Sequence, residues 1–298
     1  MKFRLTTSSA VLFATVEASQ FLVTWNDAGK GMTLQRTASL SNPKWEDVPG
    51  SEGTNRVTLP MTSASEFFRL FRPAPAGLLA WWPGDGNALD VVGGKDGSLR
   101  NGATFAPGVG GQAFSFDGVD DYLEVPLLLG GLSEGTVEFW FDVDSWDYTS
   151  APDGIYLWAC VEWLPQGPVS FDGMNLGTHR GATATGELIF GIFPWEAGQW
   201  FWAYSGVTPA LNTWYHVAGT WRPTGIRIYV NGQLKGTHDY TGPMPSYALH
   251  NLVGCSSWPQ SAIQGKVDEL RLYSRALSES EIRAIYEAGG TGKVKPAL

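Results

Sequence analysis

The chain has 298 residues and a formal net charge of −9, and its aromatic residues (13%) are almost as frequent as its charged ones (16%). This negative charge, with no cluster of lysine or arginine, argues against a nucleic-acid or anionic-membrane ligand. No apolar run reaches the roughly 18 residues of a membrane-spanning helix. Short apolar runs between glycine- and proline-rich turns predict an all-β protein.

The N-terminal segment has two interpretations. A basic start and an apolar core at 10–16 are typical of a leader covering residues 1–18. The alternation from Leu12 to Val16 is instead typical of a β-strand. We favour the strand, because Glu17 stands where a leader is usually neutral.

Residues 1–73 predict a small β-module made of short strands and turns. Within it, Thr24-Trp25, Leu40–Trp45 and Glu66–Leu70 resemble a fibronectin-like module found in large secreted bacterial proteins. Residues 74–77 combine proline with alanine and glycine and show neither alternation nor helical periodicity. They predict a linker.

From Leu78 onward, many short strands at regular spacing predict an antiparallel sandwich or jelly roll. Asn231-Gly232 is typical of a two-residue hairpin turn. One short helix is expected after Ser278, which forms a capping box with Glu281. The expected strands are 78–82, 113–116, 122–125, 136–143, 186–193, 200–204, 214–221, 226–230 and 267–273.

Six sequence blocks of this region occur in an order typical of one family. They are Leu79–Asp90, Gly111–Tyr122, Thr136–Trp140, Trp214–Thr220, Ile228–Gly232, and Val267–Ser278 with Glu281-Ile282. Together they resemble the laminin-G-like, concanavalin A-like lectin and glucanase jelly rolls over residues 78–290, which leaves 291–298 as a tail. The resemblance implies two antiparallel sheets, a secreted or cell-surface protein, and a binding or adhesion role.

The two cysteines leave two alternatives. Cys160 and Cys255 form either one disulfide or two buried free thiols. We expect the disulfide only because the family resemblance implies an extracellular protein.

A catalytic role would need paired carboxylates on one strand face. Glucanases of the wider superfamily carry a Glu-x-Asp-x-Glu arrangement, in which period 2 aligns the acids. Here Glu138 and Asp142 would lie on the same strand face, but Trp140 occupies the position between them, so the motif is not met. No other catalytic signature is present. We expect no catalytic site, and solvent-facing strand acids are the favoured interpretation.

The resemblance also implies one structural calcium ion where the loop of the first strand meets the last strand. Asp90 and Asp268 are the candidate carboxylate ligands. The equal alternative is that Asp90 makes a turn and Asp268 binds Arg271 or a loop amide. Asp117, Asp120 and Asp121 form a second acidic group, for which turn-making Asx interactions are favoured.

Aromatic residues supply the remaining functional hint, since sugar rings stack on tryptophan and tyrosine. Trp200, Trp202 and Tyr204 fall on one strand face by period 2. Trp146 and Trp195 lie in or near expected turns. The alternative for all five is core packing, which a large sandwich also requires.

These observations favour a non-catalytic extracellular module that binds a glycan through the jelly roll. Two alternatives stay open: a structural or adhesion module that binds a cell-surface or extracellular protein, and a glycoside-active enzyme that uses Glu138 or Asp142.

Overall fold

The structure is a computed structural model that describes residues 6–7, 10–17, 20–26, 32–41, 43–52, 54–60, 66–71, 75–146, 154–161, 172–179, 186–246, 250–255 and 262–289. The chain folds as two compact units, one containing Met1–Pro75 and the other Ala76–Gly292. Among the described residues no helix is long and apolar enough to cross a membrane.

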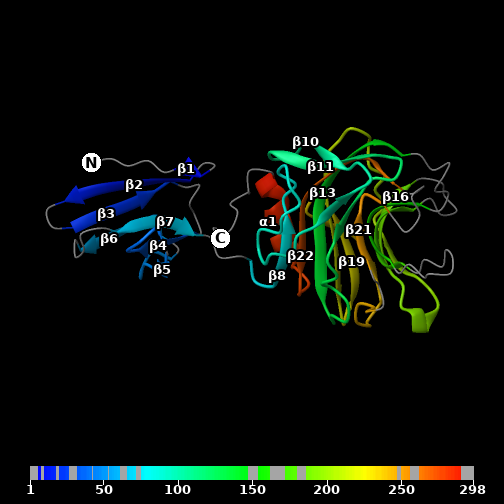
Figure 1. Cartoon of the computed structure of the whole chain (residues 1–298). Coiled ribbons are helices and arrows are strands. Elements are labelled where there is room, and N and C mark those ends of the chain that lie inside the picture. The colour runs from blue at the N-terminus through cyan, green and yellow to red at the C-terminus, as the bar shows by residue number, and fades with distance from the viewer. Residues whose placement is uncertain are drawn as a thin grey trace. The chain divides into compact units, whose positions relative to one another are not determined.

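The first unit consists of two small sheets (Figure 1). Strand β2 pairs with β3 through Leu12 and Trp25, as the strand interpretation of the N-terminal segment requires. Val23, Trp25 and Leu34 form most of a small buried core. One sheet has the order β1-β2-β3-β6 and the other β5-β4-β7, with bounds β1 (Thr6–Thr7), β2 (Ala10–Glu17), β3 (Gln20–Trp25), β4 (Thr33–Thr37), β5 (Glu46–Asp47), β6 (Arg56–Pro60) and β7 (Phe67–Phe71).

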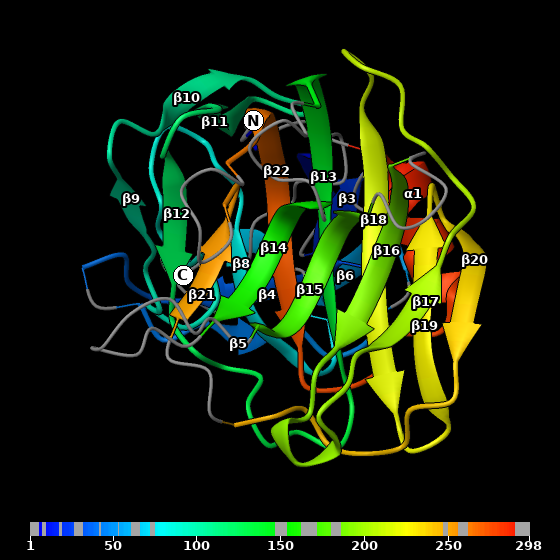
Figure 2. The same cartoon turned by 90° about the vertical axis from the view of Figure 1, so that its right-hand side faces the viewer.

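The second unit is the expected two-sheet antiparallel sandwich, seen edge-on in Figure 1. One sheet of eight strands has the order β10-β11-β22-β13-β18-β19-β20, with β8 also paired to β22. The other sheet has seven strands in the order β17-β16-β15-β14-β21-β12-β9 and faces the viewer in Figure 2. The strands are β8 (Leu78–Trp82), β9 (Ser98–Arg100), β10 (Thr104–Pro107), β11 (Gln112–Asp117), β12 (Tyr122–Val125), β13 (Gly135–Ser145), β14 (Gly154–Val161), β15 (Asp172–His179), β16 (Glu187–Ile192), β17 (Phe201–Tyr204), β18 (Tyr215–Arg222), β19 (Gly225–Val230), β20 (Gln233–His238), β21 (His250–Val253) and β22 (Gln264–Tyr273).

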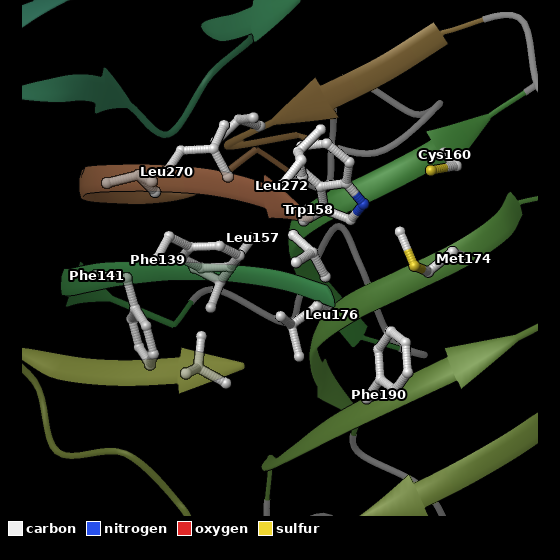
Figure 3. Packing of buried hydrophobic residues seen from close by; sticks show 14 of the residues in the cluster. Phe139, Phe141, Leu157, Trp158, Cys160, Met174, Leu176, Phe190, Leu270 and Leu272 are labelled. Atoms are coloured by element: carbon white, nitrogen blue, oxygen red, sulfur yellow. The ribbon is translucent and has the colours of Figure 1, made fainter. Parts of the chain in front are cut away.

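Side chains from both sheets fill the core between them (Figure 3). On β13, Phe139 and Phe141 point into this core, whereas Glu138 and Trp140 alternate to the outer face. On β16, Phe190 does the same from the opposite sheet. Burying this continuous apolar layer provides the main driving force for the fold.

The two sheets also meet along one side, where β17 lies beside β20. Gly236 permits this approach, because a Cβ atom there would lie only 2.0 Å from the backbone oxygen of Tyr204. Strand β17 is therefore an edge strand of its sheet that is held close by the second sheet.

Helix α1 (Glu279–Ala288) covers the outer face of the eight-stranded sheet, where Ile282 packs with Tyr229 and Tyr273. The expected capping box is present: the Ser278 backbone N–H donates to Glu281 Oε2 at 2.9 Å, and the Glu281 N–H donates to Ser278 Oγ at 3.3 Å. Arg275 adds two hydrogen bonds to the Glu281 carboxylate, at 2.6 and 3.0 Å.

The two cysteines correct a sequence prediction, because both are buried free thiols and not a disulfide. Cys160 pairs with Asn251 across β14 and β21, and its Sγ donates to Asn251 Oδ1 at 2.8 Å. Cys255 follows β21 four residues beyond Asn251. The strand register places Asn251 opposite Cys160, whereas Cys255 comes after Gly254 (φ 87°), beyond the end of β21, so pairing of these strands does not bring the two cysteines opposite each other.

The helix cap predicts a pH-dependent contribution to stability. The pKa of Glu281 is lowered from 4.5 to about 2, mainly by its hydrogen bonds from Arg275. A depressed carboxyl pKa stabilises the fold above pH 4.5, and this contribution is lost as the pH falls towards 2. Glu281→Gln should lower the free energy of unfolding by about 0.5–1 kcal/mol at pH 7, since the pair is partly exposed.

Urea titrations of wild type and Glu281→Gln between pH 7 and 2 measure this difference, which should shrink towards pH 2. Glu279→Gln is the matched control, because Glu279 pairs with Arg283 on the exposed helix face and, among the described residues, is not bonded to Arg275. A difference that stays constant across this range would contradict the assignment.

The free thiols predict indifference to reductant. The thermal unfolding temperature should be the same with and without a phosphine reductant, and both thiols should react with a thiol reagent only after denaturation. An intact mass lower by two hydrogens under non-oxidising purification would show that the cysteines are bonded after all.

Candidate functional site

Five aromatic rings gather at the edge strand β17 of the seven-stranded sheet. We call them the β17 aromatic cluster: Phe193, Trp200, Trp202, Tyr204 and His179. The Trp200 and Trp202 rings stack with centroids 4.2 Å apart and planes 14° apart. His179 lies 5.8 Å from Trp202 and 6.3 Å from Tyr204, and Phe193 lies 5.3 Å from Trp200. The expected grouping of Trp200, Trp202 and Tyr204 on one face is therefore present.

The alternation of β17 places this cluster on the outside of the sandwich. Ala203 points into the core, so Trp202 and Tyr204 point away from it. Gly191 lies opposite Trp202 on β16, and a Cβ atom at Gly191 would lie 1.9 Å from the Trp202 ring. The missing side chain is what lets this indole lie across the neighbouring strand.

The cluster combines a rigid base with exposed rings. Trp202 is held between Gly191, Trp200 and His179, whereas the Tyr204 side chain keeps 47% of its surface exposed. Glu187, paired with His179 in the register, accepts a hydrogen bond from Gly206 N–H at 2.6 Å. Burial, and then the charge of Glu187, raise the pKa of Tyr204, so its hydroxyl stays protonated at neutral pH. The surface offers ring faces, a hydroxyl and a carboxylate.

The sequence identified only part of this cluster. His179 is brought in from β15 and Phe193 from the end of β16, and only the strand register shows that they are neighbours. Trp195 lies in the 3₁₀ turn Trp195–Ala197 between β16 and β17, and its side chain lies outside the described residues. Trp146 packs against the sandwich core, as its alternative interpretation requires.

The candidate catalytic carboxylates occupy the opposite sheet and are engaged in ion pairs. Glu138 is fully buried and binds His216 Nε2 at 2.9 Å and Arg271 Nη1 at 3.0 Å. Burial raises the pKa of Glu138, but Arg271 and His216 outweigh it and the net shift is downward. Asp142 pairs with Lys266 at 3.1 Å. Glu138 is therefore a structural anion with no surface for a substrate.

Between these two acids, Trp140 stacks on Tyr286 of α1, with centroids 5.6 Å apart. Arg271 also pairs with Glu269 and lies 4.4 Å over the Trp81 ring. The favoured interpretation of these strand acids as solvent-facing is thus wrong: α1 and its neighbours cover Glu138, and Asp142 is buried beside Lys266.

The candidate calcium ligands each have hydrogen-bond partners. Asp90 is buried and accepts from the backbone N–H groups of Trp81, Val92, Gly93 and Lys95, at 2.9 to 3.1 Å. Asp268 Oδ2 accepts from Gly110 N–H at 3.3 Å. These contacts match the turn and loop-amide alternative, and a calcium ion held by Asp90 and Asp268 stays a prediction.

The chain belongs to the concanavalin A-like lectin/glucanase superfamily. The family match covers residues 117–283, that is, most of the second unit and more than half of the chain. It does not reach the first unit, so the fibronectin-like resemblance of that module stays a prediction. A search of curated proteins finds no match.

Solved structures of low sequence identity share this fold. Domain 4 of AbnA, a GH43 extracellular arabinanase from Geobacillus stearothermophilus, in complex with arabinotriose, is 17% identical with a TM-score of 0.56, and covers 70% of this chain and 98% of its own. The receptor-binding domain of botulinum neurotoxin D is 16% identical with a TM-score of 0.52. The binding domain of botulinum neurotoxin DC in complex with SialylT is 12% identical, also at 0.52.

The matches with the two toxin domains cover 71% of this chain and about half of theirs (52% and 51%). At these identities the likeness concerns the fold of the second unit.

The contact between Gly191 and Trp202 yields a prediction for the cluster. Gly191→Ala should displace the Trp202 ring, remove the exciton signal of the stacked tryptophans from the circular dichroism spectrum, and cost about 1–3 kcal/mol in stability. A double-mutant cycle with Trp202→Ala is the control, because without the indole the new methyl group has nothing to meet. Equal costs of Gly191→Ala in both backgrounds would refute the contact.

Proposed function

We propose that the second unit is a non-catalytic carbohydrate-binding module whose ligand stacks on the β17 aromatic cluster. The observation that carries this proposal is the stacked Trp200–Trp202 pair beside the half-exposed Tyr204 on the outer side of an edge strand. Large, rigid ring faces beside a hydroxyl and a carboxylate are suited to a sugar, which presents C–H groups on one side and hydroxyls around its rim.

Two of the structures with this fold are complexes, one with arabinotriose and the other with SialylT. They support a carbohydrate as the class of ligand and do not indicate which glycan this chain binds. A module that binds an external polysaccharide acts outside the cell, so the proposal includes a secreted or cell-surface protein.

Within the cluster, Trp200 and Tyr204 are assigned to ligand contact and Trp202 to support. One face of the Trp202 ring is covered by Trp200, and its six-membered ring lies over Gly191. Truncating Trp202 would therefore remove the base of the cluster, whereas truncating Trp200 and Tyr204 tests the contact surface itself.

The experiment is affinity electrophoresis and a glycan array on the full chain, with arabinan and sialylated glycans among the probes. Trp200→Ala/Tyr204→Ala should weaken retention at least about tenfold, equivalent to about 1.4 kcal/mol. Phe13→Ala is the matched control, because Phe13 is 50% exposed in the first unit.

Three outcomes contradict the proposal. If the wild type is retained by no glycan but binds an extracellular protein, the adhesion alternative replaces it. If retention is unchanged in the double variant, the sugar binds elsewhere on the chain. Release of reducing sugar by the wild type would contradict the non-catalytic assignment.

A further inference from the structure

At one edge of the sandwich the chain crosses twice between the two sheets, and three acidic residues, Asp117, Asp120 and Asp121, lie there. Residues 118–121 carry the chain from β11 in one sheet to β12 in the other, and 101–103 carry it from β9 to β10. Asn101 Nδ2 donates to the backbone oxygen of Asp120 at 2.8 Å, which holds the two crossings together.

One carboxylate of this group is buried with an oxygen that lacks a partner. Asp121 is only 3% exposed, and its Oδ2 accepts from the Asp117 backbone N–H at 3.1 Å. Its Oδ1 is shielded from solvent and has no hydrogen-bond partner among the described residues. Gly102 leaves room beside it, since a Cβ atom there would lie 3.0 Å from this oxygen. A buried anionic oxygen without a donor is unfavourable unless a cation or a proton accompanies it.

Two further carboxylates lie close to Asp121. One oxygen from each of Asp117, Asp120 and Asp121 lies within 4.8 Å of the others. Calcium binds oxygen at about 2.3–2.6 Å, so two of its ligands stand up to about 4.6–5.2 Å apart. The spacing therefore fits one calcium ion, with solvent-accessible Asp117 and Asp120 leaving positions for water.

We propose that Asp117, Asp120 and Asp121 bind one calcium ion that fastens the β11–β12 crossing. The turn-making contacts expected for these residues are present as well: Asp117 Oδ1 accepts from Val119 N–H at 2.8 Å. They use Oδ1 of Asp117 and Oδ2 of Asp121, whereas Oδ1 of Asp121 has no hydrogen-bond partner among the described residues. This site is separate from Asp90 and Asp268, and it is independent of the proposed sugar binding.

The test is calorimetric titration of the chelator-treated full chain with calcium chloride, with terbium luminescence sensitised by the adjacent Tyr122 as a second readout. The wild type should bind one ion and unfold at a higher temperature in millimolar calcium. Asp121→Asn and Asp120→Asn should each weaken binding at least tenfold. Asp120→Asn keeps the test valid if the buried Asp121→Asn variant fails to fold.

Asp239→Asn, at an exposed aspartate after β20, is the matched control and should bind as the wild type does. The proposal is overturned if the wild type takes up no calcium. In that case a proton on the Asp121 carboxyl group would neutralise the buried oxygen. The proposal is equally overturned if both variants bind like the wild type, or if binding is lost only in Asp90→Asn.

Discussion

The buried ion pair between Glu138 and Arg271 decides how the two faces of the sandwich are used. It joins β13 to β22, His216 adds β18, and the Trp81 ring under Arg271 adds β8. Removing one partner of such a pair typically costs about 3–5 kcal/mol, because the other charge stays buried. The side chains on the outer face of the eight-stranded sheet therefore stabilise the fold, and α1 packs over them.

The seven-stranded sheet carries the candidate site because its outer side has no such helix in the described part of the chain. At its edge, a glycine on β16 makes room for an indole on β17, and a second indole stacks on the first. The stacked rings form a rigid surface. Because they are already fixed by their packing, ligand binding would not have to restrict their motion. Low conformational cost on binding is the physical advantage of such preorganised aromatic surfaces.

Much of the fold follows from local sequence. The capping box of Ser278 and Glu281 predicts α1, and Asn231-Gly232, with positive φ angles of 49° and 75°, predicts the β19–β20 hairpin. The segments of β14 and β15 were not predicted. Asp172–His179 contains Gly173 and Gly177 and little β-branched sequence, so its strand is formed by pairing with β14 and β16 and not by its own propensity.

The sequence by itself determined the all-β class, the family, the helix and the period-2 row of Trp200, Trp202 and Tyr204, because these depend on residues close together in the chain. The tertiary structure alone decided that Cys160 and Cys255 stay apart, that Glu138 is buried in an ion pair, and that His179 joins the aromatic row. Each of these depends on strand register and on which face a helix covers, and both are set by packing between residues distant in sequence.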